Sequence, residues 1–107
     1  MRVWDIHPKY LCRQHLLGEH RELHAIWTIL TKNKKGYRYH PETKRWVGKL
    51  PALYLRHNNL VEEMEKRMYR HASPLEKRRA RGAARQGAFI NTIAEQRVIL
   101  RAKPCPC

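Results

Sequence analysis

The feature that most constrains the fold is a helical stripe of apolar residues near the start of the chain. Leu16, Leu23, Trp27 and Leu30 stand at i, i+7, i+11 and i+14, which places their side chains on one face of an α-helix. Proline at position 8 blocks an earlier helical turn. We therefore predict a helix that begins at residue 9 or 13 and ends near residue 32.

The rest of the sequence predicts two more helices and no strands. A second helix is expected over residues 51–70, because Pro51 suits a first helical turn and apolar residues follow at helical spacing. A last helix is expected over 92–103, because Thr92 and Glu95 form a capping pattern and Pro104 ends it. Residues 73–87 are basic and contain glycines, and they fit either a short helix or a loop. The prediction is an all-α class, a compact single-domain bundle (1–107) of about three helices with long basic loops.

The charge of the chain indicates a polyanionic partner. Its 107 residues include 23 Lys and Arg against nine Asp and Glu, for a net charge of +14. Such an excess opposes compaction by self-repulsion and is typical of nucleic-acid-binding proteins. An anionic membrane surface is the weaker alternative, since no helix joins a clean basic face to a bulky apolar one.

The cellular setting follows from what the sequence does not contain. No secretory signal and no run of about 18 apolar residues is present. Three cysteines are too few for a disulfide framework, so we expect reduced thiols. The expectation is a cytoplasmic monomer that does not bind membranes.

Two basic segments are the expected clamps on a nucleic-acid backbone. Residues 31–50 carry seven Lys and Arg against one Glu, interleaved with Tyr37, Tyr39 and Trp46. These aromatic side chains either stack beside an extruded base or hold the loop on the core. The basic residues predicted to contact DNA here and in the second segment are Lys34, Lys35, Arg38, Lys44, Arg45, Arg78 and Arg79.

A second stripe on the first helix is polar in one half and apolar in the other. Cys12, His15, Glu19 and Glu22 lie on one line that continues into two isoleucines, directly beside the apolar stripe. The two carboxylates should therefore be partly buried, which raises the pKa of a carboxyl group unless a cation or a hydrogen-bond donor compensates. The alternative is that they are boundary residues paired to nearby Arg or Lys.

The histidines of this helix raise the question of a metal. His20 and His24 fall on the opposite face, where solvated side chains are expected, although their i,i+4 spacing suits a pair of ligands. His15 with Glu19 and Glu22 also shares a stripe, yet no second helix offers a matching set of histidine or acidic residues. The terminal Cys-Pro-Cys supplies two ligands at most. We therefore expect no metal and no organic cofactor.

The stretch "RQHLLGEHREL", residues 13–23, closely resembles the helix motif of the pyrimidine-dimer DNA glycosylases of the phage endonuclease V type. That motif is Gln-His-Leu followed, after a short gap, by Arg-Glu-Leu. The opening "MRVW" is similar to the start of the family, and the similarity extends through "HPETKRWVGKLPALYLRH" and "SPLEK" to the end of the chain.

The resemblance implies a compact three-helix fold and a glycosylase that also cleaves abasic sites. Such enzymes use the N-terminal α-amine as nucleophile and the Glu of Arg-Glu-Leu as catalytic carboxylate, which correspond here to Met1 and Glu22. Arg2, His15 and Arg21 fall on the family's DNA-contacting positions. Because Arg2 is too bulky for ordinary methionine removal, Met1 is expected to be retained. The implied partner is double-stranded DNA containing damaged pyrimidines or abasic sites.

Two departures from the family pattern leave the substrate open. A further Arg of the helix in the phage enzyme is Ala25 here, and the chain ends in "AKPCPC" without the aromatic tail associated with lesion recognition. Pyrimidine dimers, another damaged base or an existing abasic site therefore remain alternatives. A non-catalytic, basic nucleic-acid-binding protein is the alternative from another functional class.

Overall fold

The computed structural model describes residues 2–32, 36, 39–69, 75, 79–80 and 82–102. Its elements in chain order are a 3₁₀ helix η1 (Pro8–Tyr10) and the α-helices α1 (Arg13–Thr31), α2 (Pro41–Lys44), α3 (Leu50–Lys66) and α4 (Ile93–Ala102). The only strand-like pairing among the described residues is a single bridge between Lys49 and Gly82. The all-α prediction is confirmed. Within the described ranges, no helix has both the length and the apolar character that crossing a bilayer requires.

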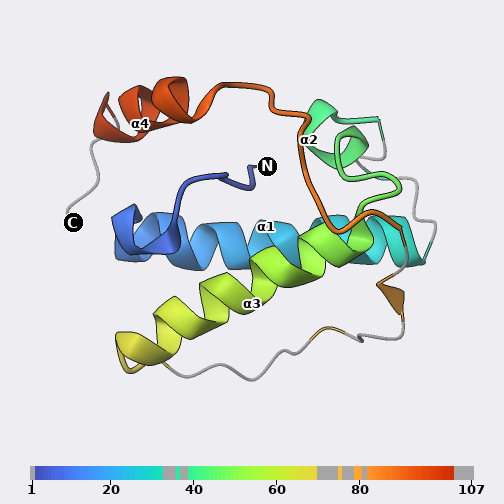
Figure 1. The fold of residues 1–107 in the computed structure, drawn as a ribbon. Coiled ribbons are helices and arrows are strands. Elements are labelled where there is room, and N and C mark those ends of the chain that lie inside the picture. Colours follow the sequence, from blue (N-terminus) through green and yellow to red (C-terminus); the bar gives the residue numbers. More distant parts are fainter. Residues whose placement is uncertain are drawn as a thin grey trace.

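The core forms where α1 packs against α3, and Figure 1 shows these two helices side by side. Leu16, Leu23 and Trp27 of the predicted stripe are buried, and α3 contributes Leu53 and Leu60 to the same cluster. Each fully buried side chain of this size contributes about 1.5–3 kcal/mol. The radius of gyration of 13.5 Å agrees with the value of about 13 Å for a compact chain of about 100 residues.

Helix α4 lies apart from this pair, on the far side of the N-terminal segment (Figure 1). The predicted capping box opens it: the Thr92 N–H donates to the Glu95 carboxylate at 2.8 Å, and the Glu95 N–H donates to the Thr92 hydroxyl at 3.1 Å. These two hydrogen bonds lower the pKa of the exposed Glu95 carboxyl. The start of the last helix is therefore confirmed.

The segment that leads to α4 is fixed by a close backbone approach. The Ala83 N–H donates to the Gly48 carbonyl at 2.8 Å, and Gly82 has a φ of 123°. A Cβ at position 82 would collide with the Gly48 carbonyl oxygen, so only glycine fits there. Residues 82–90 contain no helix, whereas most of the predicted helix-or-loop segment before them lies outside the described residues.

Two differences from the predicted helices have clear local causes. Helix α2 was not predicted; Pro41 sits in its first turn and the His40 ring nitrogen accepts the Glu42 N–H at 3.1 Å. Helix α3 ends at Lys66 rather than near residue 70, because Met68 has a φ of 64°. The N–H groups of Tyr69 and Met68 donate back to the carbonyls of Met64 and Glu65, which is a Schellman motif.

A substitution at this motif should stabilise the protein. Met68 occupies the left-handed position that glycine favours, and its side chain is 91% exposed, so little packing is lost on removing it. We expect Met68→Gly to raise the free energy of unfolding by up to about 1 kcal/mol, since relief of left-handed strain exceeds the added entropy of the unfolded chain. Urea unfolding measures the change. Met68→Ala is the control and should give no gain; equal gains for both variants would contradict the explanation.

Candidate active site

The N-terminal segment runs back along α1. The chain passes from η1 directly into α1, and the Trp4 N–H donates a hydrogen bond to the Glu19 carboxylate. The Trp4 ring also meets the His15 ring edge-on, with 6.1 Å between their centroids. These contacts place the segment alongside the first two turns of α1. Figure 1 shows the segment ending above the middle of α1.

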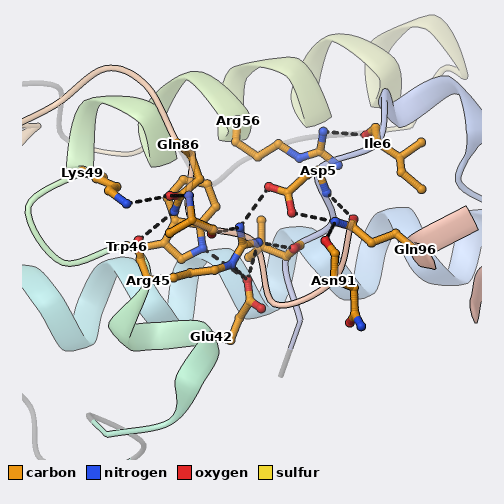
Figure 2. Close-up of polar contacts among 12 residues, drawn as sticks. Asp5, Ile6, Glu42, Arg45, Trp46, Lys49, Arg56, Gln86, Asn91 and Gln96 are labelled. Atoms are coloured by element: carbon orange, nitrogen blue, oxygen red, sulfur yellow. Dashed lines mark hydrogen bonds and ion pairs between the residues drawn. The ribbon is translucent and has the colours of Figure 1, made fainter. Parts of the chain in front are cut away.

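Two arginines from other elements, Arg45 buried and Arg56 half-buried, hold this segment in place (Figure 2). Arg45 donates to the Val3 carbonyl at 2.6 Å and to the Asp5 carboxylate at 3.0 Å. Arg56 of α3 donates to the Ile6 carbonyl at 2.7 Å. Because extended backbone has no internal partners, these donors replace the hydrogen bonds that a sheet would provide.

Helix α4 adds a side-chain amide to the same segment. The Gln96 amide accepts the Asp5 N–H and donates to the Asp5 carboxylate, at 2.8 and 2.9 Å. Arg2 donates to the Asn91 side chain at 2.8 Å and stacks on the Trp4 ring, with 4.6 Å from its guanidinium carbon to the ring centroid. The segment is thus attached to α1, α3 and α4 at once.

Glu19 is buried and paired, as the stripe analysis allowed. Arg56 grips its carboxylate at two points, with nitrogen–oxygen distances of 2.6 and 2.9 Å. Burial raises the pKa of the Glu19 carboxyl, and the Arg56 charge and hydrogen bonds oppose that rise without cancelling it. Glu19 therefore ties α1 to α3 and to Trp4 and is not available to a ligand.

Glu22 lies one turn further along the same stripe and has a different environment. Its side chain is half-buried, and no described residue donates a hydrogen bond to its carboxylate or pairs with it. Arg21 beside it is exposed, and Arg2 is half-buried. The Arg2 Nε is buried and has no partner among the described residues. Glu22 thus offers a half-buried carboxylate with no partner among the described residues, one turn beyond the point where the N-terminal segment contacts α1 through Glu19.

His15 belongs to the same face, nearer the start of α1. Its Nδ1 lies 3.3 Å from the Cys12 sulfur, and its ring contacts Trp4. Cys12 is disulfide-bonded, which corrects the expectation of reduced thiols. Three cysteines are too few for a network of disulfides, but they are enough for a single disulfide.

His15 also lines a cavity of about 770 Å³ that sequence analysis missed. Four arginines surround it: Arg13, Arg67, Arg97 and Arg101. Arg67 is held by the carbonyls of Pro8 and Leu11, while Arg13 and Arg97 lie over Tyr69 and Tyr10. Residues from α1 and α4 far apart in sequence form the cavity, so no local charge pattern marked it.

The burial of Arg45 contradicts the prediction that this residue contacts DNA. It is 8% exposed, and its guanidinium donates to Glu42 and to the Ala88 carbonyl as well as to the N-terminal segment. Trp46 is 2% exposed and donates to Glu42 at 3.2 Å, so it holds the loop on the core rather than stacking on a base. Arg45 was assigned from the basic loop, whose local sequence does not show that this turn is buried, whereas for Trp46 the structure selects the second of the two alternatives stated above.

The other predicted DNA contacts divide into exposed and undescribed residues. Lys44 and Arg79 are exposed, as is Tyr39. The remaining predicted residues lie outside the described part of the chain: Met1, Lys34, Lys35, Tyr37, Arg38 and Arg78.

His20 and His24 do not lie on a solvated face, which corrects the prediction. Both are half-buried against α3, where His57 meets them. The His24 Nε2 lies 3.2 Å from the Nε2 of each of the other two. His57 is the single histidine of α3, so no repeated spacing in the sequence marked it as a partner of His20 and His24.

The residues of this site fall within a segment that is similar to a known protein family. The family model of the pyrimidine dimer DNA glycosylases matches residues 1–77, which is most of the chain and includes α1, α2 and α3. The chain belongs to this family. No curated protein and no solved structure gave a match.

Membership gives the chain a DNA-repair function of the pyrimidine dimer glycosylase type, with damaged DNA as substrate. The matched residues carry Glu22, Arg21, His15 and the whole N-terminal segment. The cavity arginines of α4 lie beyond the match.

The Glu19–Arg56 pair leads to a pH-dependent prediction. In Arg56→Met, burial acts on Glu19 without the opposing charge, so its pKa rises further above the ordinary 4.5. A raised folded-state pKa gives a contribution to stability that is present below the unfolded value and lost as pH rises through the folded one. We therefore expect a loss of about 3–5 kcal/mol at pH 8 and a smaller one at pH 5, measured by urea unfolding. Adding Glu19→Gln should remove the difference between the two pH values; an equal loss at both in the single variant would contradict this.

The adjacent residues Arg45 and Lys44 should differ in their contribution to the free energy of unfolding. Arg45→Met removes the partner of two carboxylates, Asp5 and Glu42, and should lower the free energy of unfolding by about 3–5 kcal/mol. Lys44→Met removes the same charge from an exposed position and should change it by no more than about 0.5 kcal/mol. Thermal and urea unfolding distinguish the two. Similar small effects would show that Arg45 is not the structural residue described above.

Proposed function

We propose that the protein is a DNA glycosylase with abasic-site lyase activity, in which the α-amine of Met1 is the nucleophile and Glu22 the catalytic carboxylate. The observation that carries the proposal is the half-buried Glu22, unpaired among the described residues, one turn beyond Glu19, which the N-terminal segment contacts through Trp4. A carboxylate in that position suits a cation that arises only during the reaction.

The chemistry of an α-amine supports the choice of nucleophile. Its pKa of about 7.7–8.0 leaves roughly a fifth to a third of it neutral at pH 7.4, against about 0.1% of an ordinary lysine. The reactive form is thus about 200-fold more abundant without any lysine being buried. The hydrogen bonds to Val3, Asp5 and Ile6 restrict the segment that carries this amine, which favours a fixed angle of attack.

The proposed reaction has four steps: displacement of the base, Schiff-base formation, elimination and hydrolysis. The amine nitrogen bonds to C1′ of the damaged nucleotide, the glycosidic bond breaks, and the base leaves with the electron pair and takes up a proton. Loss of the amine proton and opening of the sugar give a protonated Schiff base. Glu22 stabilises this cation and removes a proton from C2′, and the 3′ phosphate then leaves. Hydrolysis of the Schiff base returns the free amine.

The proposed DNA contacts are basic side chains from several elements. His15 and Arg21 lie on α1 with Glu22, Arg2 lies in the N-terminal segment, and the arginines of the cavity add positive charge beside His15. The exposed Lys44 and Arg79 extend the interface, together with Lys34, Lys35, Arg38 and Arg78, which lie outside the described residues. Because each neutralised phosphate releases counterions, affinity should fall steeply with salt. The proposed substrate is double-stranded DNA with pyrimidine dimers or related damage, bound by a monomer.

Borohydride trapping on a duplex with one abasic site tests the mechanism. The wild type should form a covalent adduct on reduction, because a Schiff base is an obligatory intermediate. Glu22→Gln should cut adduct formation and strand cleavage by about two to four orders of magnitude, the usual contribution of a positioned acid–base group. An N-terminal extension that moves the α-amine away should abolish both.

Matched variants keep the test specific. Glu62→Gln changes an exposed carboxyl of α3, and a C-terminal extension adds the same residues at the other end; neither should affect trapping. A duplex with a single cyclobutane dimer measures the glycosylase step separately from the lyase step. Binding to DNA with no adduct in the wild type would favour the alternative of a non-catalytic DNA-binding protein. An adduct that survives the N-terminal extension would assign the nucleophile to a lysine.

A further inference from the structure

Three histidines from two helices converge at the α1–α3 interface. His20 and His24 lie one turn apart on α1, and His57 reaches them from α3. Their ring centroids are 4.6–5.1 Å apart, and one nitrogen from each ring lies within 4.8 Å of the others. His57 is 2% exposed, whereas the two α1 histidines are half-buried. The cluster thus has a closed side against the core and an open side toward solvent.

The distances within the cluster match those of a metal site. The His24 Nε2 lies 3.2 Å from the His20 Nε2 and 3.2 Å from the His57 Nε2. A tetrahedral metal with metal–nitrogen bonds of about 2.0–2.1 Å holds its ligand nitrogens about 3.3 Å apart. Two of the three nitrogen pairs therefore already lie at the spacing that a single ion requires, and the third pair lies within 4.8 Å.

Hydrogen bonds among the three rings cannot account for both short contacts of the His24 Nε2. A ring nitrogen has either one proton or one lone pair, so the His24 Nε2 cannot form a good hydrogen bond with two other Nε2 atoms at once. One shared cation satisfies all three lone pairs. The His57 Nδ1 lies 3.5 Å from the Asn58 side-chain oxygen, and a proton on that Nδ1 leaves the Nε2 free to bind a metal.

We propose that His20, His24 and His57 bind one divalent transition-metal ion of the zinc class, with a fourth position open to water. Imidazole ligands favour zinc and its neighbours over magnesium or calcium, which prefer oxygen. Three neutral histidines with an open position are a known zinc coordination set. The ion joins α1 to α3 through ligands 33 or more residues apart in sequence.

This site is separate from the carboxylate that the proposed lyase reaction uses. At 100° per residue, Glu22 points about 160–200° away from His20 and His24 around the axis of α1. The metal therefore faces α3, and Glu22 lies on the other side of α1. The inference does not depend on the proposed function, and failure of either leaves the other standing.

Calorimetric titration of the chelator-treated full chain with Zn²⁺ alone tests the site. We expect one ion per chain and a higher unfolding temperature with Zn²⁺, because an ion that binds only the folded state stabilises it. His20→Gln and His24→Gln should each weaken binding at least about tenfold, since even partners of ligands contribute about 10–100-fold. These two positions are half-buried, so the variants avoid the risk to folding of replacing the buried His57; circular dichroism checks the fold.

Controls and a spectroscopic measurement identify the ligands. His7→Gln, at an exposed histidine outside the cluster, should bind Zn²⁺ like the wild type. The Co²⁺ form should show the visible absorption of tetrahedral coordination without sulfur-to-metal charge transfer. Absence of stoichiometric binding, or unchanged affinity in both cluster variants, would overturn the proposal. So would a site that is lost on replacing Cys105 and Cys107 by serine but kept in His20→Gln.

Discussion

The structure depends on two guanidinium groups, one buried and one half-buried, that hold an extended N-terminal segment against a helix. Arg45 and Arg56 come from different parts of the chain, and each donates both to a carboxylate and to a backbone carbonyl of residues 3–6. Arginine suits this role because its planar fork satisfies several acceptors at fixed angles and stays charged when buried. The segment is thereby ordered although it belongs to no helix or sheet.

This constraint has a consequence for the proposed chemistry. A terminal amine is ordinarily the most mobile group of a chain, and mobility would cost much of the advantage of an intramolecularly positioned nucleophile. Here the backbone is held from residue 3 onward, and Trp4 adds a contact to Glu19 on α1. Glu19 and Glu22 thus have different roles on one stripe of α1. Glu19 is paired with Arg56 and fixes the geometry, whereas the Glu22 carboxylate has no partner among the described residues.

Helical periodicity was enough to predict the fold class and most helix boundaries. The stripe through Leu16 and Leu23 and the Thr92–Glu95 capping box are local signals, and both appear in the structure as predicted. The resemblance to the family was likewise recognised mainly from a short local motif, residues 13–23. The burial of Glu19 beside a compensating cation was also anticipated, since an apolar neighbouring stripe implies it; which arginine supplies the charge was not, because Arg56 lies 37 residues away.

The errors share one physical origin, which is contact between distant segments. The sequence of a basic loop does not show which of its basic side chains face solvent. Lys44 is exposed, whereas the adjacent Arg45 is buried against the N-terminal segment. Face assignment on a single helix likewise placed His20 and His24 in solvent, because it identified only one of the two faces of α1 that are covered. Helix α3 covers not only the apolar stripe but also the neighbouring histidine face, through a histidine that is isolated in its own helix.

The two faces of α1 are coupled through α3. His57 follows Arg56 directly in the sequence, so the histidine cluster and the Glu19 ion pair share one turn of α3. An ion bound at the cluster would fix the position of that turn relative to α1. Because Arg56 also holds the Ile6 carbonyl, the same ion would restrict the N-terminal segment without contacting it. A metal on one side of α1 would in this way stabilise the geometry on the other side, while taking no part in the chemistry proposed for Glu22.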